Sequence, residues 1–119
     1  MSRRSERLQD QIRSDISELL QREASDPRLL NGAMISITEV EITEDLRYAK
    51  VFVSILGSEA QVREAFDGVQ HAGGFLRHEL ARRLVLRRVP ELSFYLDPSV
   101  TRGARILELL KELGEQQQG

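Results

Sequence analysis

The 119-residue sequence contains no cysteine, no tryptophan and only three prolines. Without cysteine, a disulfide framework and a thiolate-bound zinc site are both excluded, and a reducing compartment fits best. No apolar run approaches the length that crosses a membrane, and the polar start "MSRRSERLQD" is unlike a signal peptide. We therefore expect a single domain over residues 1–119, with a frayed tail at 114–119.

Motifs for catalysis, metal binding and nucleotide binding are also missing. His71 and His78 are seven residues apart without a suitably spaced carboxylate pair, so they do not form a metal site. No Ser/His/Asp order, P-loop or G-x-G-x-x-G occurs. Glu44 and Asp45 are adjacent acids, but they lie in a predicted turn, where solvated side chains are the simpler explanation. The sequence therefore predicts no enzyme, no metal and no cofactor.

Positive charge is unevenly placed along a chain whose net charge is −2. Acidic residues outnumber basic ones over residues 37–67, and the reverse holds over residues 77–105. Because the local distribution of charge sets the electrostatic field, basic clusters on a slightly acidic protein suit phosphate binding at one surface. The bases are almost all arginine, whose planar fork pairs with phosphate. The clusters are Arg3, Arg4 and Arg7, then Arg77, Arg82, Arg83, Arg87, Arg88, Arg102 and Arg105.

Apolar spacing predicts an α+β domain. Residues 5–24 have a helical stripe, and residues 33–42 and 47–56 form two strands of an antiparallel hairpin. A one-residue slip between Ile37 and Val40 predicts a β-bulge. Ser58 and Gln61 form a capping-box pattern that begins another helix. A further helix to about residue 84, a strand over 89–96 and a last helix from about 98 complete a three-stranded sheet with helices on one face.

The pair Gly73-Gly74 interrupts this helical stretch, although each interior glycine costs a helix about 1 kcal/mol relative to alanine. One interpretation is a C-cap, with glycine at C′, that ends one helix before the next begins. Another is a side-chain-free corner that a nucleic-acid backbone can approach closely. The following residues favour the second, because His78 and Arg82 point away from the apolar stripe. Arg77 and Arg83 lie at its margins, so we expect replacement of Arg82 and Arg83 by alanine to leave the fold nearly intact.

The predicted helix–glycine turn–helix beside a three-stranded sheet resembles a KH domain of the second topological type, without the usual G-x-x-G loop. The segment Ala72-Gly73-Gly74 is similar to the Ala-x-Gly kink that the ribosome-binding factor A family carries instead. The middle residue of that kink, often Ser in the family, is Gly73 here. The other similar segments are "QREASDPRL" (21–29), "VEITEDLRYAKVFVSIL" (40–56), "RRVPELSFYLD" (87–97) and "GARI" (103–106).

The resemblance implies a cytoplasmic, non-catalytic assembly factor of the small (30S) ribosomal subunit. Such a factor binds 16S rRNA in late precursors, assists maturation of its 5′ end, matters most in the cold and is linked to a GTPase that releases it. We expect a monomer with no membrane partner. With the basic clusters, the resemblance predicts RNA contacts from Arg3, Arg4, Arg7, Ala72, Gly73, Gly74, Arg77, His78, Arg82, Arg83, Arg87 and Arg88.

Two alternatives remain at this point. The domain can instead be a protein–protein adaptor without direct RNA binding, pairing through an unpaired sheet edge. Tyr48, Phe52 and Tyr95 can stack on bases, but packing explains them more simply. With so few aromatic residues, RNA binding is expected to rest on phosphates and shape more than on base readout.

Overall fold

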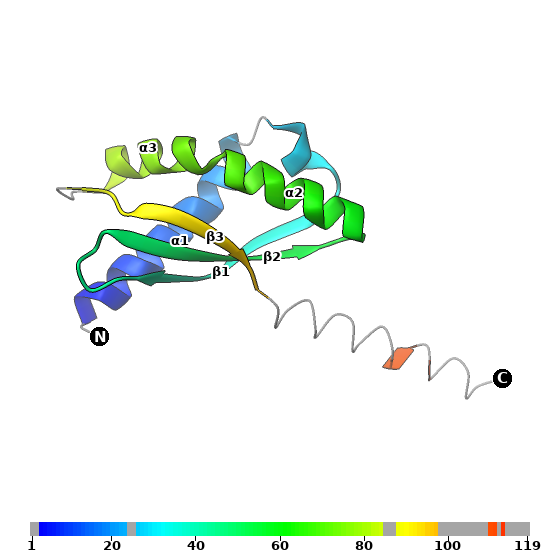
Figure 1. Cartoon of the computed structure of the whole chain (residues 1–119), viewed down its shortest axis with the longest axis horizontal. Coiled ribbons are helices and arrows are strands. Elements are labelled where there is room, and N and C mark those ends of the chain that lie inside the picture. The colour runs from blue at the N-terminus through cyan, green and yellow to red at the C-terminus, as the bar shows by residue number, and fades with distance from the viewer. Residues whose placement is uncertain (1–2, 24–25, 85–87, 98–109, 112, 114–119) are drawn as a thin grey trace.

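The computed structural model describes residues 3–23, 26–84, 88–97, 110, 111 and 113. Figure 1 shows a sheet crossed by one long helix, with two further helices following one another beside the strand β3. The α+β class predicted from the sequence is confirmed. In chain order, the elements are α1 (Arg3–Glu23), the 3-10 helix η1 (Pro27–Leu30), β1 (Met34–Ile42), β2 (Tyr48–Leu56), α2 (Glu59–His71), α3 (Gly73–Arg83) and β3 (Glu91–Leu96).

The sheet has three strands in the order β1-β2-β3. β1 and β2 pair antiparallel, which confirms the predicted hairpin, whereas β2 and β3 pair parallel. The register of the hairpin shifts between Ile37 and Glu39, so Thr38 is the extra residue of the predicted β-bulge. A parallel pair needs a long crossover, and α2 with α3 supplies it. Because β3 is last in the strand order, it is an edge strand, and its outer side can form a wall of a surface groove.

One face of the sheet is buried beneath the helices. Along β2, Val51, Val53 and Ile55 are almost fully buried, whereas Lys50 on the other face is exposed. Each such side chain contributes about 1.5–3 kcal/mol of hydrophobic stabilisation when it is removed from water. These buried strand residues form one cluster with buried residues of α1, α2 and α3. The helices therefore cover one face of the sheet, as predicted. Their core residues are Ile12, Ile16 and Leu19 of α1, Ala65 and Val69 of α2, and Leu76 and Leu80 of α3.

The start of α2 is fixed by the predicted capping box. The Ser58 hydroxyl accepts a hydrogen bond from the Gln61 backbone N–H at 3.1 Å, and the Ser58 N–H donates to Gln61 Oε1 at 2.8 Å. The Gln61 side chain also donates to the carbonyl of Asn31, which follows η1. These bonds satisfy exposed backbone groups at the helix start. They also hold α2 in a defined position relative to the chain before β1.

Most of the predicted C-terminal helix from about residue 98, and the tail 114–119, lie outside the described residues. Leu110, Lys111 and Leu113 are described and helical. Within the described part of the chain, no helix combines the length and the apolar character that crossing a membrane would need.

Candidate nucleic-acid interface

A groove of about 560 Å³ lies between the junction of α2 with α3 and the edge strand β3. One wall comes from the last turn of α2 and the first turns of α3, and the other comes from β3. The groove therefore brings the predicted residues Gly73, Gly74 and Arg77 together with a strand that lies far along the sequence. Its lining residues are Gln70, Gly73, Gly74, Arg77, Glu91, Leu92, Ser93, Phe94 and Tyr95.

The break between α2 and α3 is centred on Ala72, not on a left-handed glycine. Ala72 has φ −76° and ψ −6°, whereas an α-helix has ψ near −42°. Gly73 follows this C-cap residue, as the C-cap interpretation requires. However, neither Gly73 nor Gly74 has the positive φ that usually selects glycine at such a position. The break is confirmed, and its glycines need a different explanation.

The surroundings of the two glycines supply that explanation. A Cβ on Gly73 would lie 3.3 Å from Cε2 of Phe94, so the missing side chain lets α3 approach β3 closely. A Cβ on Gly74 would meet nothing within 4 Å, because this residue faces open space. The first turn of α3 carries no acidic residue, and no side chain caps its start. The first backbone N–H groups of α3 therefore have no side-chain cap that would keep an anion in the groove away from them.

Arg77 links α3 to the chain that leads into β3. Its Nη2 donates to the carbonyl of Val89 at 3.3 Å, while the residue itself is exposed. Arg88 is the neighbour of Val89 and is also exposed. The contact thus brings Arg77 close to the chain that carries Arg88.

His78 and Arg82 lie on the exposed outer surface of α3, as the helical phase predicted. The Arg82 side chain is 71% exposed and lies 3.5 Å from Glu79 Oε1 in the same helix. Exposed pairs of this kind hold a side chain only weakly. Arg82 is consequently free to reorient towards a phosphate.

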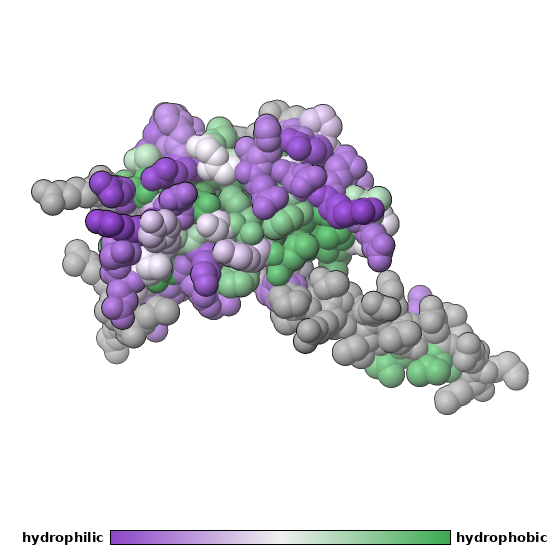
Figure 2. Space-filling view, in the orientation of Figure 1, coloured by the Kyte–Doolittle hydropathy of each residue, from purple (hydrophilic) through white to green (hydrophobic). Residues whose placement is uncertain are grey.

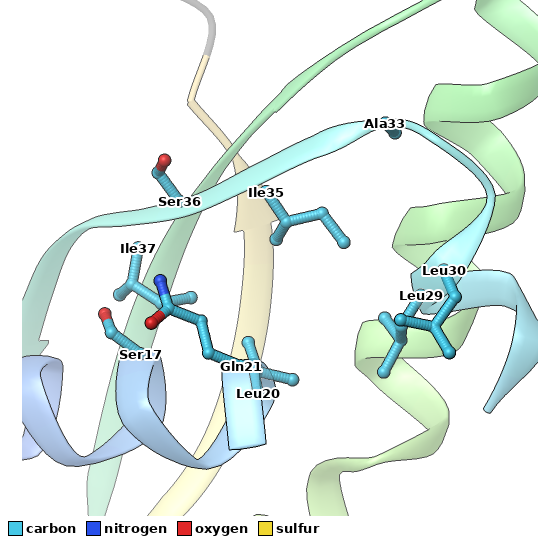
Figure 3. A pocket seen from close by; sticks show the side chains of 9 residues that line it. All are labelled: Ser17, Leu20, Gln21, Leu29, Leu30, Ala33, Ile35, Ser36 and Ile37. Carbon is cyan, nitrogen blue, oxygen red and sulfur yellow. The ribbon is translucent and has the colours of Figure 1, made fainter. Parts of the chain in front are cut away.

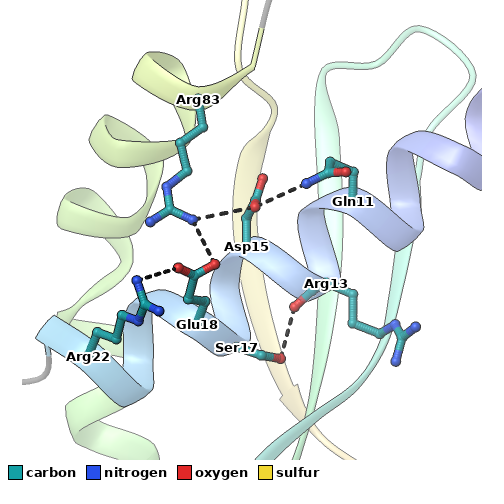
Figure 4. Close-up of polar contacts among 7 residues, drawn as sticks. All are labelled: Gln11, Arg13, Asp15, Ser17, Glu18, Arg22 and Arg83. Atoms are coloured by element: carbon teal, nitrogen blue, oxygen red, sulfur yellow. Dashed lines mark hydrogen bonds and ion pairs between the residues drawn. The ribbon is translucent and has the colours of Figure 1, made fainter.

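Arg83 is held differently, and the structure corrects the expectation that it stands clear of the packing. Its Nη1 lies 3.4 Å from Oδ1 of Asp15 and 3.3 Å from Oε2 of Glu18, both in α1 (Figure 4). Asp15 is only 6% exposed, and among the described residues its Oδ2 is buried without a hydrogen-bond partner. A buried carboxylate depends on its cation. Arg83 therefore joins α3 to α1, and its replacement is expected to disturb the packing.

The N-terminal basic cluster is placed only in part. Arg7 is exposed near the start of α1. Two residues later, the Gln9 side chain accepts a hydrogen bond from the Ile42 N–H, so this end of α1 lies beside the end of β1. The side chains of Arg3 and Arg4, and the whole of Arg87, lie outside the described residues. A single positive surface shared by both clusters stays a prediction.

A second hollow, of about 280 Å³, lies between α1, η1 and β1 (Figure 3). Among the described residues, none of those that line it is charged, so it does not suit a phosphate. Among the described residues, no group of three or more His, Asp or Glu side chains could hold a metal ion. The groove beside β3 is therefore the better candidate. The second hollow is lined by Ser17, Leu20, Gln21, Leu29, Leu30, Ala33, Ile35, Ser36 and Ile37.

Sequence reasoning missed the wall that β3 contributes. Ser93 and Tyr95 line the groove beside Gln70. The alternation of polar and apolar residues in a strand does not show whether that strand lies at the edge of its sheet. One available signal was Pro90 directly before the strand, because proline is confined to edge strands, strand starts and bulges.

Comparisons with known proteins agree with this architecture. The family model of ribosome-binding factor A matches residues 4–110. Ribosome-binding factor A of Caldanaerobacter subterraneus subsp. tengcongensis is 50% identical over 117 residues, which cover 98% of this chain and 94% of that protein. The protein of the same name from Acetivibrio thermocellus is 47% identical over 116 residues, which cover 98% and 93%.

Solved structures agree as well. The crystal structure of ribosome-binding factor A from Thermus thermophilus has a TM-score of 0.66 at 27% identity, covering 77% of this chain and 93% of that one. A Thermus thermophilus homology model, fitted into a cryo-EM map of a 30S complex of that factor, has a TM-score of 0.57 at 28% identity, covering 75% and 90%. These similarities confirm the predicted KH-like fold. With a family model that spans most of its length and relatives about half identical to it, the chain belongs to the ribosome-binding factor A family.

Proposed function

We propose that the protein is a maturation factor of the small ribosomal subunit that binds 16S rRNA of late 30S precursors. The observation that carries this proposal is the groove in which Gly73, Gly74 and Arg77 face β3, at the position of the family's Ala-x-Gly kink. A family member fitted into a map of a 30S complex supports the choice of partner.

The RNA backbone follows the α3 side of the groove. A phosphate lies at the open start of α3, where Gly74 leaves room and the helix dipole is favourable. Arg77, His78 and Arg82 extend the positive surface along the helix, and Arg88 adds to it from the chain before β3. Glu91 on the opposite wall disfavours a phosphate there, so the backbone keeps to α3.

Bases face the β3 side of the same groove. Tyr95 lines it and is 45% exposed, so its ring can stack on a base. The Ser93 hydroxyl can accept or donate one hydrogen bond. With only these groups, affinity comes mainly from phosphates and shape, and sequence readout is weak.

The wider role follows from the family resemblance. The protein acts in the cytoplasm as a monomer without catalytic activity and assists maturation of the 16S 5′ end, most visibly in the cold. A ribosome-associated GTPase promotes its release. Cells that depend on a binding-deficient variant should accumulate unprocessed 16S precursor at low temperature, which primer extension measures directly.

Filter binding to 30S precursors at several salt concentrations tests the proposed site. Arg82→Ala should weaken binding and lower the slope of log affinity against log salt by about 0.7 to 1, because one phosphate contact is lost. Arg63→Ala is the matched control, because Arg63 is an exposed arginine on α2. Equal affinities and equal slopes for the two variants would exclude α3 as the RNA-binding surface and leave the adaptor alternative.

A further inference from the structure

The face of the sheet opposite the helices, called the open face below, is largely exposed, although Ser54 on it is buried and Phe52 is half-buried. Strand register defines its composition. Phe52 is opposite Glu39 on β1 and opposite Tyr95 on β3, and the Phe52 and Tyr95 rings are 5.9 Å apart. In the next row, Lys50 is opposite Glu41 and Ser93. The remaining rows pair Tyr48 with Glu91, Ser36 with Ser54, and Met34 with Leu56. An aromatic centre thus lies among acidic residues, with an apolar pair at one end.

Exposure shows that this face is an unusual surface for a small domain. Met34 is 68% exposed, Tyr48 52% and Leu56 37%, although each is large and apolar or aromatic. In Figure 1 the strands lie in front of α1, and the same view in Figure 2 shows green and pale surface next to purple surface. Large apolar and aromatic side chains left exposed among polar residues are typical of protein-interaction sites.

The charge of the open face determines which partner fits it. Glu39, Glu41 and Glu91 are exposed there, and Lys50 is the basic residue among the described side chains of the face. The face is therefore net acidic, opposite in sign to the outer surface of α3. A nucleic-acid backbone is repelled by such a face, whereas a basic polypeptide is attracted to it.

We infer that the open sheet face, centred on Phe52 and bounded by Glu39 and Glu41, docks a lysine- and arginine-rich segment of a partner protein. The Tyr48 ring receives a cationic side chain over its face, and the carboxylates pair with the other cations of the segment. Met34 and Leu56 pack against the apolar residues between these cations. Tyr95 lies both in this face and in the RNA groove, so the two surfaces meet at β3. The protein can hold RNA and a basic protein segment side by side.

Hydrogen bonds from the Thr38 bulge connect the strands at the centre of this face. The Thr38 hydroxyl lies 2.8 Å from Oδ2 of Asp97 and 3.2 Å from the Phe52 carbonyl, so the bulged residue of β1 reaches across β2 to the end of β3. A surface fixed in this way loses little conformational entropy when a partner binds.

The test uses a fluorescein-labelled peptide of alternating arginine and valine, with the same peptide carrying glutamate for arginine as the control probe. Binding to the full ¹⁵N-labelled chain is followed by anisotropy and by amide chemical shifts. We expect the shifts to concentrate on Glu39, Glu41, Lys50 and Phe52. The acidic residues of α2, namely Glu59, Glu64 and Asp67, provide an internal control because they offer similar charge without a fully exposed aromatic residue.

A matched pair of double variants makes the result quantitative. Glu39→Lys with Glu41→Lys should weaken peptide binding by about tenfold or more, because attraction becomes repulsion. Glu59→Lys with Glu64→Lys reverses the same charge on α2 and should change the affinity by less than about twofold. The Glu39→Lys, Glu41→Lys double variant should not weaken RNA binding, so a failure of this inference is distinguishable from a failure of the RNA proposal.

Several outcomes would overturn the inference. Equal losses from both double variants, or equal shifts on α2, would show general electrostatic attraction. Open-face shifts with a single-stranded RNA instead of the peptide would assign the face to RNA. Chemical shifts that change with protein concentration alone would assign the open face to a second copy of the chain. Methyl contacts from Met34 to Leu110 or Leu113 would assign it to the chain's own C-terminal segment.

Discussion

The Arg83 guanidinium of α3 lies 3.4 Å from the Asp15 carboxylate of α1, a contact that joins residues 68 positions apart in the chain. Its neighbour Arg82 is 71% exposed and pairs weakly within its own helix. Two consecutive arginines that look equivalent in the sequence therefore have different roles. One orients α3 against α1, and the other presents charge to the solvent.

Arg83→Ala should lower the free energy of unfolding by about 1–3 kcal/mol, because it leaves the buried Asp15 carboxylate without its cation. The 3–5 kcal/mol typical of a fully buried pair is not expected, since the Arg83 side chain is 31% exposed. Arg82→Ala should change the free energy of unfolding by no more than about 0.5 kcal/mol. Urea denaturation of the two variants measures the difference, and coincident midpoints would contradict the assigned roles.

Gly74→Ala should raise the free energy of unfolding by about 0.5–1 kcal/mol, because alanine is the better helix former and its Cβ meets nothing within 4 Å. Gly68→Ala in α2 is the contrasting control. Its Cβ would lie 3.0 Å from both Arg28 Cβ and Leu29 Cδ2, so overpacking should destabilise the protein by about 1–3 kcal/mol. Thermal unfolding should therefore move in opposite directions, and equal shifts would argue against the described packing of η1 on α2.

Gly74→Glu should weaken RNA binding well beyond Gly74→Gln, because the two side chains have similar size and differ in charge. A glutamate in the first turn of α3 suits the helix dipole, so the fold should be retained. The negative charge nevertheless occupies the position proposed for a phosphate. Filter binding compares the two variants after circular dichroism has confirmed their folds. Equal affinities would move the phosphate away from the start of α3.

Acid should destabilise the protein partly through Asp26. The hydrogen bonds from the side chain and the backbone of Arg28 lower the pKa of Asp26 from 3.8 to about 2. A carboxylate whose pKa is lower in the folded state stabilises the fold above its unfolded pKa, and this contribution is lost as the pH falls from about 4 to about 2. The stability difference between the wild type and Asp26→Asn should therefore shrink over that interval. Urea midpoints that stay parallel over this pH range would contradict the assignment.

Local features of the fold were predictable from the sequence. The slip between Ile37 and Val40 marks the bulge, Ser58 with Gln61 marks the start of α2, and the glycine pair marks the break before α3. Each of these features depends on residues close together in the chain. Backbone geometry and side-chain spacing therefore leave a local pattern in the sequence that predicts them.

Long-range features could not be predicted in the same way. Helical phase places Arg83 at the margin of the apolar stripe, but nothing in the pattern of α1 identifies Asp15 as its partner. The wall that β3 gives to the groove could not be predicted either, because the alternation of residues in a strand does not show that the strand lies at the edge of the sheet. Likewise, the close approach of Phe94 to Gly73 depends on how α3 packs on β3.

The parallel pairing of β2 with β3 has a consequence for the newly made protein. Val51 pairs with Phe94, so β3 joins the sheet only after both intervening helices have been synthesised. α1 and the β1–β2 hairpin depend on nearer contacts and can form while the chain is still growing. Because β3 forms one wall of the groove, a growing chain has no groove until β3 has been synthesised and has paired with β2.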